Sequence, residues 1–123
     1  MREVKKNPVS GAMLMEQLAT APVISTLFSA RTTNGTSSVF AVKKGKKTIQ
    51  AFITGTGSVS GTLTWYGSLV NSASNGVLLA TSPLAGTNAD VTSEEITTDW
   101  PYMFCTLASI TGTGAAVTAM VGV

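Results

Sequence analysis

The residue types that carry most enzyme chemistry are nearly absent from this chain. It has no histidine and one cysteine, Cys105. A Ser-His-Asp triad, a Cys-His pair and a zinc site of the Cys/His kind are therefore excluded. We expect Cys105, which lies in the apolar run 102–110, to be a buried structural thiol. The sequence predicts no catalytic residue, no metal site and no cofactor.

The acidic residues of the second half could in principle serve glycoside hydrolysis or bind calcium. They are Asp90, Glu94, Glu95 and Asp99. Because they lie in a polar, turn-rich segment without EF-hand spacing, a solvated edge is the better interpretation. A phosphate-binding loop is also excluded, because neither Gly-Thr-Gly is followed by Gly-Lys-Ser/Thr or opens a helix.

Charge is scarce and unevenly distributed. Charged residues make up 11% of the 123 residues, and every Lys and Arg lies at or before Lys47. The first 47 residues carry eight basic and two acidic side chains (+6), and the remainder carries four acids (−4), which gives the net +2. The basic first 47 residues and the acidic remainder could favour contact between neighbouring copies of the protein, or the asymmetry could be chance. The low fraction of charged residues has two equally good explanations. A partner could cover much of the protein's surface, or the outer faces of a β-sandwich could carry Thr and Ser instead of charged residues.

A lysine cluster around one glycine is the most suggestive binding patch. It consists of Lys43, Lys44, Lys46 and Lys47. It could bind an acidic protein surface or nucleic-acid phosphates, or it could be a solvated hairpin tip. Nucleic-acid binding is disfavoured because Phe40 is the only aromatic residue nearby. The aromatic residues Trp65, Tyr66, Trp100 and Tyr102 could stack on a sugar ring, although core or interface positions are commoner for such residues.

The elements that position these residues are predicted to be short antiparallel strands. Ile-Thr-Gly-Thr-Gly occurs twice, at 53–57 and 110–114, each time between runs rich in Val, Thr, Leu and Ile. This pattern is typical of hairpins, and we expect Gly55, Gly57, Gly112 and Gly114 to form the turns. About eight short strands at roughly 8–12-residue spacing predict a two-sheet sandwich, jelly roll or small barrel.

Residues 1–22 form a separate region before the β domain at 23–123. Within 11–19, an apolar group could make two turns of amphipathic helix that needs a surface to dock on; it consists of Met13, Leu14, Met15 and Leu18. A cleaved signal peptide is not expected, because Glu16, Gln17 and Pro22 interrupt the apolar run. No stretch is long and apolar enough to span a membrane.

The run 39–121 resembles small head-decoration (cement) and related virion proteins of tailed bacteriophages. The resemblance rests on the Lys/Gly turn leading into Thr48-Ile49-Gln50-Ala51, on the first Gly-Thr-Gly, on Asp99-Trp100-Pro101-Tyr102 and on the second Gly-Thr-Gly followed by Ala115. The resemblance covers about two-thirds of the chain and does not include residues 1–22, which we call the arm. It implies a β-sandwich, often of jelly-roll type, that is not an enzyme.

The resemblance further implies a position on the outside of the head, where such proteins clamp neighbouring major capsid protein subunits and usually act as dimers or trimers. The protein would lie on the virion's outer surface and, before assembly, in the host cytoplasm. On this hypothesis the arm residues Met13, Leu14, Met15 and Leu18 and the four lysines contact the capsid. Two alternatives remain: a tail or fibre component, and a carbohydrate-binding module.

Overall fold

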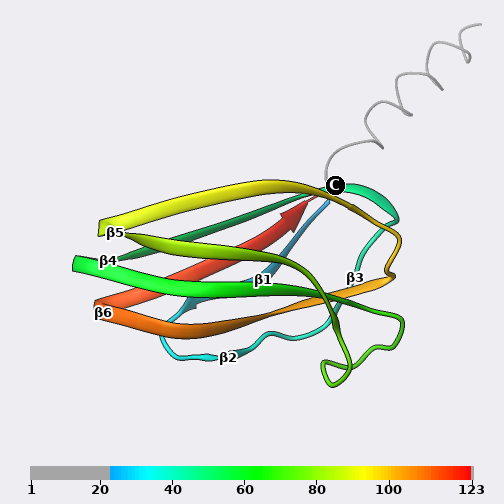
Figure 1. Ribbon diagram of the computed structural model, residues 1–123, viewed down its shortest axis with the longest axis horizontal. Coiled ribbons are helices and arrows are strands. Elements are labelled where there is room, and N and C mark those ends of the chain that lie inside the picture. The colour runs from blue at the N-terminus through cyan, green and yellow to red at the C-terminus, as the bar shows by residue number, and fades with distance from the viewer. Residues whose placement is uncertain (1–22, 123) are drawn as a thin grey trace, which may run out of the picture.

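The computed structural model describes residues 23–122, and all of its regular elements are strands. Six strands follow one another along the chain (Figure 1): β1 (Ile24–Arg31), β2 (Gly35–Thr36), β3 (Phe40–Ala41), β4 (Gly45–Ser68), β5 (Val77–Thr98) and β6 (Tyr102–Gly122). The predicted arm at 1–22, with its expected helical turns, lies outside the described residues.

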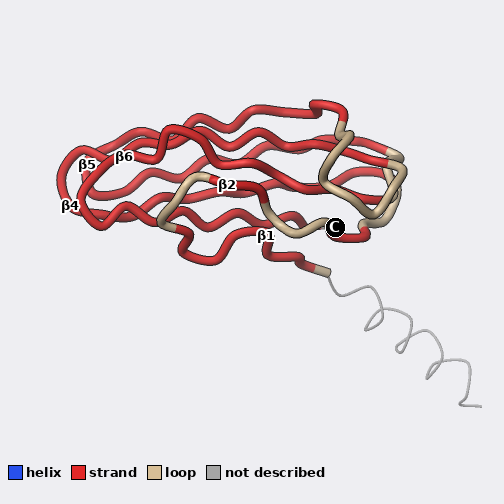
Figure 2. The backbone as a smooth tube through the Cα atoms, turned by 90° about the horizontal axis from the view of Figure 1, so that it is seen from below, coloured by secondary structure: helices blue, strands red, loops and turns tan. Residues whose placement is uncertain are grey.

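The three long strands each bend and so contribute to two layers. In β4, residues 48–54 pair with 116–122 of β6 and with 89–95 of β5, whereas residues 62–67 pair with 103–108 and 77–83. The register is interrupted between Thr54 and Ser58, at the first Gly-Thr-Gly. Figure 2 shows the three bends gathered at one end, where they join the upper and lower layers. We call this the hairpin end, because the two predicted hairpin turns lie there, and the opposite end the arm end.

The pairing gives two four-stranded antiparallel sheets. In the first sheet the strands lie in the order β1, the second half of β6, the first half of β4 and the second half of β5. In the second sheet the order is β2 with β3, the first half of β6, the second half of β4 and the first half of β5. Taken along the chain, these eight segments follow the order of a jelly roll. The chain changes sheet at every step except between the second half of β4 and the first half of β5, which are neighbours in the second sheet. The all-β sandwich prediction is therefore confirmed. The predicted hairpins at the two Gly-Thr-Gly sites are wrong: the segments on either side of each site do not pair with each other. Each pair of segments continues through the glycines as one bent strand whose halves lie in different sheets.

The core lies between the two sheets and follows the two-residue period of a strand. In β4 the odd-numbered side chains point inward on both sides of the bend, including Ile49, Ile53, Leu63 and Trp65, each at most 1% exposed. Full burial of one such aliphatic side chain stabilises the fold by about 1.5–3 kcal/mol. The indole Nε1 of Trp65 donates a 2.9 Å hydrogen bond to Ser82 Oγ, so its polar atom is satisfied inside the core.

The hairpin end is joined by two asparagine side chains. Asn88 Oδ1 accepts a 2.7 Å hydrogen bond from the Gly57 backbone N–H, and Asn34 Oδ1 accepts one of 3.0 Å from the Ile110 N–H. Each bond connects two different turns. Gly57 and Gly114 have φ of 74° and 64°, in the left-handed region that glycine accepts without strain. This end is therefore held by local polar contacts between turns.

Candidate partner interface at the arm end

The lysine cluster predicted from the sequence does not stay together in the structure. Lys43 and Lys44 are exposed. Lys46 is exposed too, and its Nζ lies 3.2 Å from Glu95 Oε1 in an ion pair whose side chains are both largely in solvent. Such exposed pairs contribute little to stability, about 0–1 kcal/mol. Three of the four lysines thus face solvent at the arm end.

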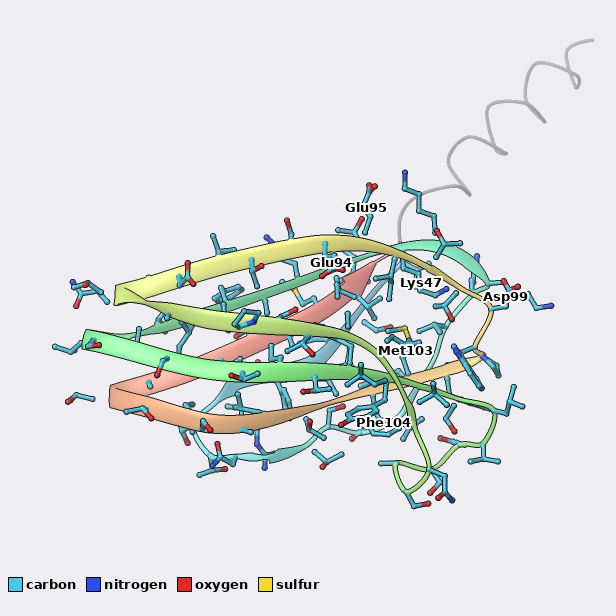
Figure 3. All side chains as sticks on the ribbon, viewed as in Figure 1. Lys47, Glu94, Glu95, Asp99, Met103 and Phe104 are labelled. Carbon is cyan, nitrogen blue, oxygen red and sulfur yellow. The ribbon has the colours of Figure 1, made fainter. Side chains whose placement is uncertain are left out.

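Lys47 occupies a different environment, because its side chain is only 1% exposed. It points into the sandwich (Figure 3), where Nζ donates hydrogen bonds of 3.0 Å to Gly45 O and 2.9 Å to Thr98 O. Burial lowers the pKa of Lys47 from its ordinary value, and the nearby charge of Asp99 acts in the opposite direction. The sequence interpretation that Lys47 belongs to an exposed tip is therefore wrong. Lys47 is one of the odd-numbered residues of β4, whose side chains point inward.

Exposed apolar side chains gather at the same end of the sandwich as Lys43 and Lys44. Val23 and Ile24, at the start of β1, are 54% and 63% exposed, and a second group flanks the loop between β4 and β5. That group consists of Leu69, Val70, Val77 and Leu78. Both the start of β1 and this loop lie on the right in Figure 1. Exposed aliphatic groups beside lysines are typical of a protein-binding surface.

The sequence predictions do not include this second apolar group. Its Leu69-Val70 pair lies in a segment rich in Ser and Asn, residues 67–76. An apolar pair beside a polar loop is a weak signal, since its exposure depends on how the loop folds. Here the loop region covers the outer face of the second sheet: Tyr66 and Phe104 stack there with ring centroids 5.1 Å apart, and Gly76 lies against the Phe104 ring and the Tyr66 Cβ.

One of the four aromatic residues considered for sugar stacking is excluded from that role. Trp65 is completely buried, so its ring is not available to a ligand. Trp100 is half-buried and packs over Gly67, where an added Cβ would lie 2.5 Å from Trp100 Cγ. The suggestion that Trp65 contacts a sugar is therefore wrong, which leaves the carbohydrate-binding alternative with the partly exposed Tyr66, Trp100 and Tyr102.

Among the acidic residues, Asp90 has a local structural role. Asp90 accepts hydrogen bonds of 2.9 Å from the backbone N–H groups of Ala85 and Val91, so it stabilises the bend of β5. Within residues 23–122 no group of three or more His, Cys, Asp or Glu side chains is placed to hold a metal ion. In the same part of the chain, no helix is long and apolar enough to cross a bilayer.

Cys105 is fully buried, as expected from its apolar run. Burial raises the pKa of its thiol to about 12, and a hydrogen bond with the Ser37 side chain opposes the shift. Ser37 also receives a 3.0 Å hydrogen bond from the Cys105 N–H and so bridges the gap between β2 and β3. A thiol with so high a pKa is a poor nucleophile.

The predicted partner-contact residues therefore divide into three groups. Lys43, Lys44 and Lys46 lie exposed at the arm end, whereas Lys47 is buried. Met13, Leu14, Met15 and Leu18 lie outside the described residues, but the segment that carries them joins the sandwich at Val23, at the arm end. The hairpin glycines lie at the other end.

Comparison with known proteins gives structural likeness only. No protein-family model and no curated protein sequence matches this chain. Among solved structures it is similar to the SPBc2 prophage-derived protein YomS, with a TM-score of 0.54 and 17% identity over 85% of this chain and 96% of that one. It is also similar to a Bacillus endospore appendage protein, from a family of disulfide-linked pili, with a TM-score of 0.50 and 13% identity over 83% and 82% of the two chains.

A looser likeness extends to VP2 of infectious bursal disease virus, with a TM-score of 0.47 and 11% identity over 84% of this chain and 32% of that one. The two closer likenesses establish that the chain shares its β fold with a prophage-derived protein and with a pilus protein. At these identities they establish the fold alone.

Proposed function

We propose that this protein is a structural virion protein of a bacteriophage: a decoration protein that binds the outside of the head and clamps neighbouring major capsid protein subunits. The observation that carries the proposal is the composition of the arm end. There the described chain begins at Val23, and the exposed aliphatic groups around Val23 and Leu69 occur together with Lys43 and Lys44. The fold shared with a prophage-derived protein supports the phage setting.

The proposed mechanism is mechanical, with no cofactor or catalytic step. The arm end faces the shell, its apolar side chains lose water on contact, and the exposed lysines meet acidic groups of the capsid protein. Met13, Leu14, Met15 and Leu18 extend the contact beyond the sandwich. The hairpin end, tied together by Asn34 and Asn88, faces outward. Bridging two subunits in this way raises the free energy needed to separate them.

The proposal also covers assembly and location. The protein acts as a dimer or trimer on the outer capsid surface after a period in the host cytoplasm, and it engages neither membrane nor nucleic acid. The basic first part and acidic last part of the chain support contacts between copies.

Co-sedimentation with capsids of the phage that encodes the protein tests the proposal. We expect saturable binding at many copies per shell, weaker binding at higher salt, and weaker binding after deletion of residues 2–22. The charge reversals Lys43→Glu with Lys44→Glu should also weaken binding, whereas Thr56→Glu with Thr111→Glu at the hairpin end should not. No binding to shells, with the protein still present in virions, would place it in the tail or fibre instead.

A further inference from the structure

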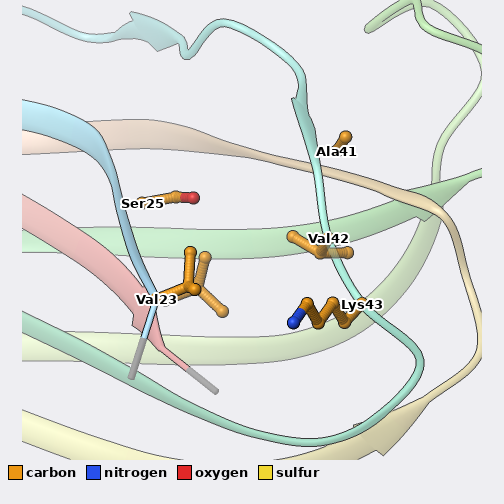
Figure 4. A pocket seen from close by; sticks show the side chains of 6 residues that line it. Val23, Ser25, Ala41, Val42 and Lys43 are labelled. Atoms are coloured by element: carbon orange, nitrogen blue, oxygen red, sulfur yellow. The ribbon is translucent and has the colours of Figure 1, made fainter. Parts of the chain in front are cut away.

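A small apolar groove opens at the edge of the sandwich where β1 approaches β3 (Figure 4). Its volume is about 270 Å³, and it is lined by Val23, Ser25, Ala41, Val42, Lys43 and Val121. Val23 and Val42 face each other across it, and the Lys43 side chain extends along its rim. The lining therefore consists mostly of aliphatic groups with one cation.

The groove also borders a free sheet edge. β1 is the terminal strand of its sheet, and all its register partners lie in β6. One side of its backbone thus faces away from the sheet, next to the exposed side chains of Val23 and Ile24. Natural sheets usually cover or charge such edges, because they attract further strands. Within residues 23–122 no strand pairs with this edge of β1, and Lys43 is the one charged residue that lines the groove beside it.

We infer that, in the protein that is not bound to a capsid, this groove is the seat of the chain's own N-terminal segment, with Met13–Leu18 packed between β1 and β3. The position where that segment joins the sandwich is the first argument. Val23 is itself a groove residue, and Leu18 precedes it by five positions, about 17 Å of extended chain. Met13 and Met15 have flexible thioether side chains that fit irregular apolar gaps.

Charge complementarity is the second argument. Glu16 is the sole charged residue between positions 7 and 22, and it lies within the apolar group. Lys43 is the sole charged residue that lines the groove. The short tether favours the groove of the same chain over that of a second copy, because a linked segment has an effective concentration in the mM range.

Disulfide trapping in the full-length chain tests this placement. In Leu14→Cys with Val42→Cys, mild oxidation should give an intramolecular bond, seen as a faster-moving monomer on a non-reducing gel and mapped by mass spectrometry. The control is Leu14→Cys with Thr97→Cys. Thr97 is exposed on β5, three strand spacings or about 14 Å across the same sheet from β1. We expect the groove pair to form about tenfold faster than the control.

A charge swap keeps the test decisive if a cysteine variant is poorly folded. Added to the groove pair, Glu16→Lys should slow trapping about two- to fivefold, and Lys43→Glu together with Glu16→Lys should restore the rate. Hydrogen exchange of the β1 amides should rise when residues 2–18 are deleted. Equal trapping rates for groove and control pairs, or no change in exchange, would overturn the inference. Predominant disulfides between chains would also overturn it, in favour of arm exchange between copies.

Discussion

Trp65 and Ser82 come from neighbouring strands, and their side chains meet in the centre of the core through a 2.9 Å hydrogen bond. Trp65 has no exposed surface, and Ser82 has 5%. A buried indole N–H without an acceptor destabilises a protein, so one small hydroxyl group allows one of the chain's two tryptophan side chains to be buried completely.

Removal of that hydroxyl should therefore destabilise the fold. We expect Ser82→Ala to lower the free energy of unfolding by about 1–3 kcal/mol in urea denaturation, because the indole N–H loses its acceptor. The exposed Ser93→Ala should change it by less than about 0.5 kcal/mol. In a Trp65→Phe background, which has no N–H, the effect of Ser82→Ala should largely disappear. An undiminished effect there would show that the hydroxyl acts through packing instead.

Lys47 should make stability depend on pH. Its pKa is lower in the folded protein than its ordinary value of 10.5, so the unfolded chain binds more protons between the two pKa values. Stability due to this group therefore rises as pH increases towards 10.5. The measurement is the free energy of unfolding of the wild type and of Lys47→Met at several pH values. The stability of the wild type relative to the variant should increase as pH rises. Lys44→Met, which removes an exposed charge, is the control, and an equal trend in both variants would contradict the assignment.

The second Gly-Thr-Gly turn contains a matched pair of glycines. Gly114 has φ of 64° with open space at the Cβ position, whereas an added Cβ at Gly112 (φ 126°) would lie 2.8 Å from Ser58 O and 2.7 Å from Val59 Cγ1. Gly114→Ala should cost about 1–2 kcal/mol, the left-handed backbone penalty. Gly112→Ala should lower the free energy of unfolding by at least about 1 kcal/mol more than Gly114→Ala does, because the backbone at Ser58 and Val59 must also move. Thermal or urea unfolding measures both, and equal losses would refute the crowding argument.

Cys105 should be chemically silent in the folded protein. With a thiol pKa of about 12, only about one molecule in ten thousand carries the reactive thiolate at pH 8. Iodoacetamide should leave the native protein unlabelled for hours and label it readily in concentrated urea, as mass spectrometry would record. Ser37→Ala, which removes the contacting hydroxyl, should not create a reactive thiol, since burial is the main cause of the shift. Rapid native labelling would show that the core opens locally.

The sequence alone predicted the local features of this fold. The repeated Ile-Thr-Gly-Thr-Gly marked two of the three bends, since glycine is the residue that tolerates such backbone. The apolar surroundings of Cys105 indicated its burial. These properties depend on neighbours within a few positions along the chain. The absence of histidine likewise limits the chemistry that any fold of this chain could support.

The tertiary structure decided which strands pair and which side chains remain at the surface. Lys47 belongs by sequence to one lysine cluster, yet the bend of β4 places its odd-numbered positions inside, so it separates from Lys43 and Lys44. Leu69 and Leu78 look like ordinary apolar residues until the fold leaves them exposed beside the same loop. The groove between β1 and β3 unites residues nearly one hundred positions apart. Such outcomes depend on contacts distant in sequence, which no local pattern encodes.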